Sequence, residues 1–321
     1  MSYAPPANTT QSAGLTHQAT VYYDRVKLDR LEQMFRFASI CEPRVIPQGS
    51  GKTTQMYRFT LPGANTTPSA ETVGTPFNQA STTVSATVEQ FSDFTSSSEL
   101  LILTDIAATT ERMVDDVSYR AAKTVDTLYR NEFDSNTGQL FATIGTAFSA
   151  ADARANRAQL TGRDIRPRAG GDFVGIIHPF VSYDLTSDNT AGGFIDVLKY
   201  TDNTRLVNSP MYGEIGKIAG VRFLETTNVN TSGTAPSVLY STYIAGDGGV
   251  GMIDLTGRGP SKIVDPRNEQ MQVNIIKGGP SPADPEGNIG QYVSYWFATV
   301  AKTLDTTTPR FRIVTADSSL V

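Results

Sequence analysis

Cysteine is almost absent from this chain of 321 residues, and its scarcity excludes several kinds of site. Cys41 is the only cysteine, so the sequence allows no intramolecular disulfide and no metal site built from several thiolates. Because Phe37 and Ile40 precede it, we expect Cys41 to act as a small buried hydrophobic residue rather than as a reactive thiol.

Histidine is nearly as scarce, with His17 and His178 far apart in the sequence. A Ser/His/Asp site would need a poised serine, but no Gly-x-Ser-x-Gly turn occurs. The sequence also lacks the His-Glu-x-x-His pattern that would indicate a zinc site. We expect His178 to cap the end of a strand, and we expect the paired carboxylates Asp115 and Asp116 to lie on the solvated side of a helix. The sequence therefore predicts no catalytic residue, no metal site and no cofactor, and so no enzyme.

Long apolar runs and clusters of basic residues are also missing. No stretch approaches the roughly 20 uninterrupted apolar residues that a membrane span needs, so we expect no contact with a membrane. The first residues, MSYAPPANTTQSAG, have neither a basic flank nor an apolar core, so we expect no signal peptide and a chain that stays in the cytoplasm. The net charge is −5, from 32 acidic and 27 basic residues, and the basic residues are scattered. Because proteins that neutralise phosphates need clustered Lys and Arg, we expect no sequence-specific binding of nucleic acid.

Residues 49–54, Gly-Ser-Gly-Lys-Thr-Thr, look like the end of a phosphate-binding loop. The full motif needs a glycine five residues before the last one, but that position is Ile46, followed by Pro47. The next residues alternate like a strand, whereas a phosphate site needs the N-terminus of a helix there. The pattern favours a turn, and a nucleotide-dependent enzyme that uses Lys52 is the alternative.

Three glycines, Gly246, Gly248 and Gly251, have the spacing of a dinucleotide-binding motif. Such a motif needs a helix directly after it. The sequence that follows, MIDLTGRGP, contains further glycines and a proline, which prevent a helix. We therefore expect a glycine-rich turn between two strands.

Two strands joined by a long polar loop are predicted in the first third of the chain. Residues 53–60 and 82–92 have strand patterns, and in the second Val84, Ala86 and Val88 alternate with polar residues. The loop between them, LPGANTTPSAETVGTPFNQA, is rich in Pro, Gly, Thr and Ser. Connections of this length are uncommon unless they are functional, although a mobile surface loop is the alternative.

Helical patterns occur in three places. Residues 21–40 follow a polar stretch that cannot fold alone, and their apolar spacing predicts a short amphipathic helix. Residues 105–133 contain neither Pro nor Gly, which predicts a helix roughly 40 Å long, and residues 150–159 predict another helix. The apolar stripe of the long helix is formed by Val114, Val117, Ala121, Val125 and Leu128. We expect ion pairs on its outer faces between Asp116 and Arg120 and between Asp126 and Arg130.

The chain beyond residue 228 is rich in strand patterns separated by Gly and Pro. They are SVLYSTYIAG, SKIVD, QVNIIKG, GQYVSYWFATVAK and RFRIV. Residues 291–302 predict a well-buried strand that carries the only tryptophan, Trp296, between Tyr295 and Phe297. We expect these aromatic side chains to lie in the core.

The stretch of residues 173–228 resembles a known family. It contains "IIHP" at the end of a buried strand, "DL" in an apolar helix, a "GEIG" turn and then "GVRFLET". This order resembles the axial domain of major capsid proteins of tailed bacteriophages of the N-four type, and the resemblance extends over about residues 20–315. It implies an α+β protein with the Hong Kong 97 capsid fold, in which the loop after residue 60 is an extended finger and the long helix is the spine helix.

The resemblance also implies a division into domains. The ranges that we expect are 1–45 for an N-terminal arm with a short helix, 46–100 for the extended loop, 101–165 and 256–321 for the peripheral domain with the spine helix, and 166–255 for the axial domain.

The function implied is that of a structural subunit which self-assembles into an icosahedral shell around phage double-stranded DNA. The expected partners are other copies in hexamers and pentamers, a portal protein, and a scaffolding or cement protein. Acidic subunits repel DNA, so a separate motor would fill the shell. The expected locations are the virion capsid and, during assembly, the host cytoplasm. Candidate contacts between subunits are Pro62, Pro68, Glu71, Pro76 and Phe77 in the loop tip and Tyr3, Pro5 and Pro6 in the arm.

Two details qualify the resemblance. Some shells of this fold are joined covalently through a lysine of the extended loop, but residues 53–99 contain no lysine, so we expect no such linkage. An encapsulin-like nanocompartment, which shares the fold and encloses cargo enzymes, is the alternative within the same architecture.

Overall fold

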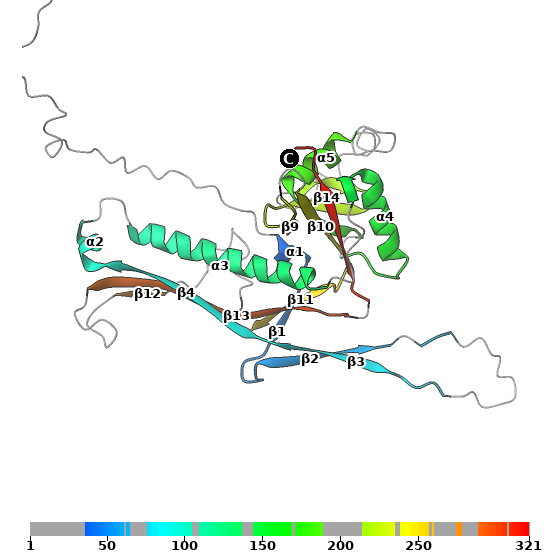
Figure 1. Cartoon of the computed structure of the whole chain (residues 1–321). Helices are drawn as coiled ribbons and strands as arrows, with labels where there is room; N and C mark the ends of the chain where they lie inside the picture. Colours follow the sequence, from blue (N-terminus) through cyan, green and yellow to red (C-terminus); the bar gives the residue numbers. More distant parts are fainter. Residues whose placement is uncertain are drawn as a thin grey trace, which may run out of the picture.

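The computed structural model describes residues 36–60, 62–64, 76–104, 109–136, 144–168, 171–188, 214–234, 238–256, 259, 274–277, 288–306 and 308–320. The helices are α1 (Phe37–Ile40), α2 (Glu99–Thr104), α3 (Thr109–Asp134), α4 (Ala150–Thr161) and α5 (Pro179–Ser187). The strands are β1 (Glu42–Ile46), β2 (Thr53–Phe59), β3 (Ser81–Thr87), β4 (Glu89–Ser98), β5 (Ile144–Ala147), β6 (Phe173–Ile177), β7 (Glu214–Ile218), β8 (Val221–Glu225), β9 (Thr231–Ser232), β10 (Leu239–Ala245), β11 (Val250–Leu255), β12 (Asn274–Lys277), β13 (Ile289–Thr303) and β14 (Phe311–Asp317). Figure 1 shows an elongated body with a rounded part at one end and a projecting hairpin.

An elongated sheet, here called the long sheet, forms one part of the body. Its strands follow the order β1-β11-β13-β12, and β4 pairs with β13 along most of its length. β1 runs parallel to β11, and the other pairs are antiparallel. α3 lies along one face of this sheet, against β13 (Figure 1).

The central strand of the long sheet confirms the buried strand predicted at residues 291–302, but one aromatic residue lies elsewhere. Val293, Tyr295 and Phe297 alternate along β13 on the face that packs under α3, and all three are buried. Trp296 lies on the opposite face, where it is only half buried. The expectation that Trp296 belongs to the core is therefore wrong, because consecutive residues of a strand point to opposite faces.

The long helix is confirmed, and it begins at Thr109. Its buried stripe consists of Met113, Val117, Ala121, Val125, Tyr129 and Phe133, with the predicted Val114 and Leu128 partly buried beside it. Arg120 forms an ion pair with Asp93 of β4 at 2.5 Å. The predicted surface pair of Asp126 and Arg130 is wrong, because Asp126 is fully buried and bonded to other segments.

A second sheet, here called the compact sheet, forms the rounded part. Its order is β5-β14-β10-β6-β8-β7, with β9 paired to β10. All five residues of β6 are buried, and α4 packs against β7 and β14 while α5 packs against β5. Gly175 in β6 allows a close approach, because a Cβ there would lie 2.7 Å from the ring of Phe223 in β8.

The described motifs of residues 173–228 belong to the compact sheet and to α5, with one correction. Glu214, Ile215 and Gly216 of the expected "GEIG" turn are part of β7, which pairs with β8 in an antiparallel hairpin, and the first glycine of the motif lies outside the described residues. The turn lies at Ala219 and Gly220, whose φ angles of 51° and 78° are both positive. Two positive φ values are what a tight two-residue hairpin of this twist requires.

Two helices of the compact part begin with side-chain caps. The helix predicted at residues 150–159 is confirmed as α4, and Ser149 and Asp152 form a reciprocal capping box at its start. His178 caps the start of α5 rather than the end of a strand, although it does follow β6 directly.

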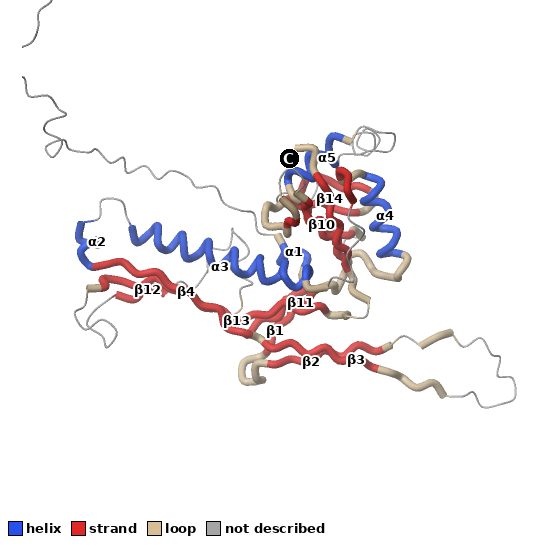
Figure 2. Tube along the Cα trace, in the orientation of Figure 1, coloured by secondary structure: helices blue, strands red, loops and turns tan. Residues whose placement is uncertain are grey.

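The two predicted loop strands are confirmed as a separate hairpin that projects from the body (Figure 2). β2 and β3 pair from Thr53 opposite Thr87 to Phe59 opposite Ser81. The second predicted strand is divided, since β4 leaves the hairpin to pair with β13. Val88 is the joint, and its N–H donates to the carbonyl of Lys52 at 2.8 Å.

Several expectations fall on residues outside the described part. Of the helix expected at 21–40, only α1 lies within it, and the expected strand SKIVD lies outside it. None of the described helices has the length and apolar character that a transmembrane helix requires.

The two sheets are built from interleaved parts of the chain. β14 and β5 pair within the compact sheet, and β11 pairs within the long sheet. The domain ranges expected from the sequence, including 166–255 and 256–321, stay a prediction.

Candidate inter-subunit surface

The residues that resemble a phosphate-binding loop form a turn at the base of the hairpin. Gly49 and Gly51 have φ angles of 86° and 84°, and the N–H of Ser50 donates to the carbonyl of Pro47 at 3.2 Å. β2 begins directly afterwards, at Thr53, so the turn leads into a strand and not into a helix. The interpretation as a structural turn is confirmed.

The glycines at 246–251 also form a turn, between β10 and β11. Gly248 has a φ of 66°, and the N–H of Gly246 donates to the carbonyl of Arg310 at 2.9 Å. A Cβ at Gly246 would lie 2.6 Å from Ile165, and one at Gly251 would lie 2.7 Å from Leu304. The predicted turn between two strands is therefore confirmed, with Gly251 already in β11, and Gly246 and Gly251 allow close packing.

His178 has a structural role. Its Nδ1 accepts a hydrogen bond from the N–H of Phe180 at 3.2 Å, and its ring stacks on Tyr240 at 4.3 Å. Burial lowers the pKa of His178 to about 4, so the ring is neutral at neutral pH. Within the described part of the chain, no group of His, Cys, Asp and Glu side chains is arranged to hold a metal ion.

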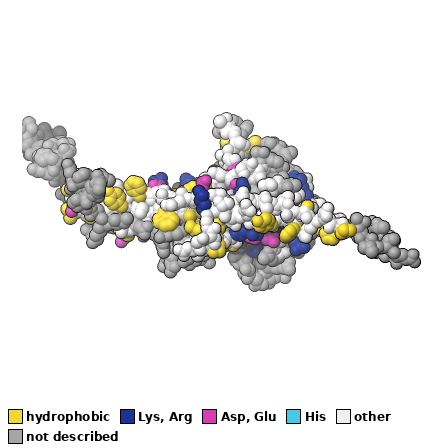
Figure 3. Space-filling model, turned by 90° about the horizontal axis from the view of Figure 1, so that it is seen from below, with side chains coloured by type: hydrophobic (Ala, Val, Ile, Leu, Met, Phe, Trp, Pro, Cys, Tyr) yellow, Lys and Arg dark blue, Asp and Glu magenta, His cyan; other side chains and the backbone are white. Residues whose placement is uncertain are grey.

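The hairpin carries large apolar side chains that its own subunit leaves exposed. Tyr57 and Phe59 on β2 are exposed. Phe77, which precedes β3 in the sequence, is 70% exposed. Figure 3, viewed from the hairpin side, shows separate hydrophobic patches along the molecule. Apolar groups grouped on a projecting element indicate a surface that another molecule covers.

The candidate contact residues are only partly described. Pro62, Pro76 and Phe77 lie near the far end of the hairpin and are exposed. The other candidates lie outside the described residues: Pro68, Glu71, Tyr3, Pro5 and Pro6. Tyr57 and Phe59 were not predicted as contact residues, although two aromatic residues at positions i and i+2 of a predicted strand share one face and so indicate an apolar strip there.

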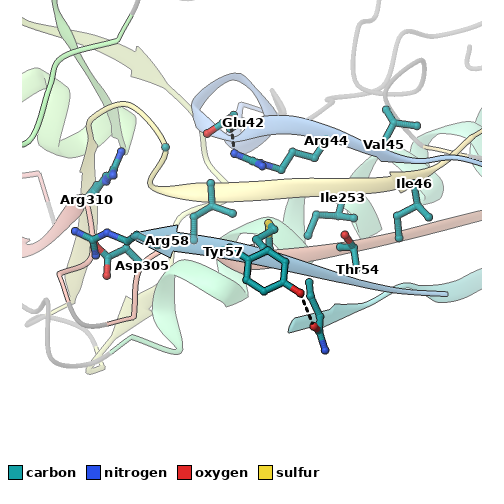
Figure 4. Close-up of a pocket in the computed structure, with 14 residues that line it drawn as sticks. Glu42, Arg44, Val45, Ile46, Thr54, Tyr57, Arg58, Ile253, Asp305 and Arg310 are labelled. Carbon is teal, nitrogen blue, oxygen red and sulfur yellow. Dashed lines mark hydrogen bonds and ion pairs between the residues drawn. The ribbon is translucent and has the colours of Figure 1, made fainter. Parts of the chain in front are cut away.

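A groove of about 610 Å³ lies at the base of the hairpin, between β1, β11 and β2 (Figure 4). Ile46, Ile253 and Met56 give it apolar lining. Charged side chains line its borders as ion pairs: Glu42 with Arg44 at 2.8 Å, and Asp305 with Arg58. The two charges of each pair neutralise each other. The residues that line the groove do not place a nucleophile beside a base.

A second apolar surface lies at the opposite end of the long sheet. Leu100 and Leu103 of α2 are exposed, the latter to 77%, and Phe94 of β4 and Ile275 of β12 are exposed as well. α2 packs against β13 and β4, so this apolar end and the hairpin mark the two extremities of the elongated body (Figure 1). No helix was predicted at the residues of α2.

The described elements define a class of fold. A projecting two-stranded loop, a long helix along an elongated sheet and a second, compact mixed sheet with helices beside it together form the α+β Hong Kong 97 capsid fold.

Comparisons with known proteins agree on this fold. No family model matches the chain, and no curated protein matches it in sequence. The chain is similar to a subunit of the capsid of Ralstonia phage GP4, with a TM-score of 0.69 and 11% identity over 99% of both chains. It is also similar to the head structure of Helicobacter pylori bacteriophage KHP40, with a TM-score of 0.67 and 11% identity over 97% of this chain and 100% of that one. The Cyanophage Pam1 capsid is similar with a TM-score of 0.63 and 14% identity, over 98% of this chain and 100% of that one.

Proposed function

We propose that this protein is the major capsid protein of a tailed bacteriophage, a structural subunit that assembles into an icosahedral shell around double-stranded DNA. The observation that carries the proposal is the similarity to phage capsid structures, which extends over nearly the whole length of this chain and of theirs. The motif order "IIHP", "DL", "GEIG" and "GVRFLET" supports it independently.

The exposed apolar surfaces fit this function. Phe77 on the projecting hairpin does not stabilise a monomer, because it stays exposed to water there. In a shell, a neighbouring subunit can bury this side chain. We propose that Pro62, Pro76 and Phe77, together with Tyr57 and Phe59, contact a neighbouring copy, and that Pro68, Glu71, Tyr3, Pro5 and Pro6 do the same. Contacts of this kind are heterologous, since the hairpin of one copy meets a different surface of the next, and they close into rings of five or six.

The remaining partners follow from the same proposal. The subunit would act without catalysis or cofactors, in hexamers and pentamers, with a portal protein and with a separate scaffolding or cement protein. It would enclose DNA without reading its sequence, and it would occur in the virion and, during assembly, in the host cytoplasm.

We also propose domains that follow the sheets. The peripheral domain would contain α2, α3 and the long sheet, and the axial domain would contain α4, α5 and the compact sheet, including β5 and β14. The N-terminal arm and the extended loop keep the ranges 1–45 and 46–100.

Electron microscopy of the full chain tests the proposal. The protein, expressed alone and with candidate scaffolding proteins, is expected to form shells, tubes or capsomers, and particles from the native source are expected to contain DNA. A compact monomer at every salt and protein concentration would contradict the shell function. Particles that hold a cargo protein in place of DNA would instead identify a nanocompartment.

A further inference from the structure

A buried carboxylate joins three segments that are distant in the sequence. Asp126 lies in α3 and is 0% exposed. Its Oδ1 accepts a hydrogen bond at 2.8 Å from the backbone N–H of Phe37, in residues 36–41, here called the root segment. Its Oδ2 accepts a hydrogen bond at 2.7 Å from the side-chain amide of Asn228, in the connection between β8 and β9. One side chain therefore connects the root segment and the compact sheet to the long helix.

Other contacts make this junction a packed unit. The ring of Phe37 lies edge-on to Tyr243 of β10, with 5.0 Å between the ring centroids. Arg168 donates to the carbonyl of Ser39 at 2.8 Å. The root segment is thus held from several sides, and Asp126 supplies the hydrogen bond to its first helical N–H.

Charged groups surround the junction without neutralising Asp126 directly. Arg130, one turn further along α3, donates to Oδ1 of Asn228 at 3.2 Å, and its Nε lies 3.8 Å from Asp134. The titratable and charged groups that influence the junction come from every element packed there: Cys41 from the root segment, Tyr129, Arg130, Glu132 and Asp134 from α3, Arg168 after α4, Tyr243 from β10 and Asp254 from β11. Arg36 contributes a backbone hydrogen bond to Asp126.

Burial is the dominant influence on the charge of this carboxylate. It raises the pKa of Asp126 from 3.8 to about 6, while the hydrogen bonds from Asn228, Phe37 and Arg36 and the charge of Arg130 oppose the rise. A carboxyl that is buried in the closed junction therefore binds its proton more tightly than the same carboxyl exposed to water.

We propose that Asp126 is a proton-operated latch that holds the root segment against α3 and the compact sheet. Because the closed junction has the higher affinity for the proton, lowering the pH through about 6 favours closure. Above that pH the ionised carboxylate must stay buried, and its desolvation opposes closure. The latch is therefore tighter in acid and looser at neutral pH. This inference concerns the subunit itself and does not depend on the shell function.

Hydrogen exchange of the full chain tests the latch, with rates corrected for the intrinsic effect of pH. The protection of the amides in residues 37–41 is expected to be about tenfold higher at about pH 5 than at about pH 7.5. This ratio follows from a pKa of Asp126 of about 6 in the closed junction and of 3.8 when the carboxyl is exposed to water. Asp126→Asn keeps an acceptor oxygen for Phe37 but cannot ionise. Its protection is expected to be the same at both pH values.

Matched variants separate the latch from a simple structural bond. Asp116→Asn changes an exposed aspartate of the same helix, and Asp134→Asn changes a half-buried one near the junction; both are expected to keep the difference between the two pH values. Asn228→Ala removes a hydrogen bond that favours the ionised form, so it is expected to move the transition to higher pH, and it serves if Asp126→Asn does not fold. The latch is refuted if the wild type shows no pH difference, if Asp126→Asn retains one, or if Asn228→Ala leaves the midpoint unchanged.

Discussion

Gly175 in β6 allows the neighbouring strand β8 to approach closely in the compact sheet. A Cβ at Gly175 would lie 2.7 Å from the ring of Phe223 and 3.3 Å from Val221. We expect Gly175→Ala to lower the free energy of unfolding by about 1–3 kcal/mol, because a well-packed interior must move to admit the methyl group. Equilibrium unfolding of the full chain in urea measures this loss.

Gly63 provides the control for this substitution, because a Cβ there meets nothing within 4 Å. Gly63→Ala is expected to change the stability by less than about 0.5 kcal/mol. Equal stability of the two variants would mean that β6 and β8 are not packed as described.

Residues differ in how far the sequence reveals their environment. The burial of Cys41 and the structural role of the Gly49–Lys52 turn were predictable from their immediate neighbours. Asp126 was not, because an aspartate with an arginine four residues later is typical of a helix surface. Its partners Phe37 and Asn228 are 89 and 102 residues away, and nothing local to Asp126 indicates them.

Among the elements, the hairpin gives the sharpest test of the proposed function. We expect that replacing residues 63–77 with an Asn-Gly turn leaves a folded subunit that does not form closed shells. The removed segment is rich in Pro, Gly and Thr and includes the exposed Phe77, so the core loses little. The lost contact would recur at every interface of a shell. Circular dichroism measures the fold, and electron microscopy measures the particles.

Closed shells of normal size from this variant would show that residues 63–77 are only a surface loop. Loss of the circular dichroism signal would instead show that the hairpin supports the fold of its own subunit. Both outcomes differ from a failure of the shell function itself, in which the wild type would not assemble either.

The elements that the sequence predicts well are those with a local period. The long helix and the two loop strands have clear apolar spacing, and both are present. The separation of β4 from β3, and the pairing of β11 with the long sheet and of β14 with the compact sheet, were not predictable. Alternation along a strand shows which side chains share a face, but it does not show which distant strand will be the neighbour.

At the scale of the whole molecule, the apolar end formed by α2 predicts a contact between copies. We expect Leu100→Ser combined with Leu103→Ser to leave the subunit folded and to reduce the yield of complete particles, because both side chains are exposed in the single chain. Sedimentation velocity separates particles from free subunits and measures the change.

The conservative double variant Leu100→Ile with Leu103→Ile is the control, and it is expected to assemble like the wild type. Normal assembly of the serine variant would mean that this end stays exposed in the shell.

The pairing of the last two strands has a consequence for the moment at which the protein can fold. β13 is central to the long sheet, and β14 lies between β5 and β10 of the compact sheet, so each sheet needs a strand from the final part of the chain. Neither sheet can be completed while that part is still inside the ribosome. Folding of the two sheets is therefore delayed until residues 289–317 have left the ribosome, and chains without these residues have no complete surface through which to join one another.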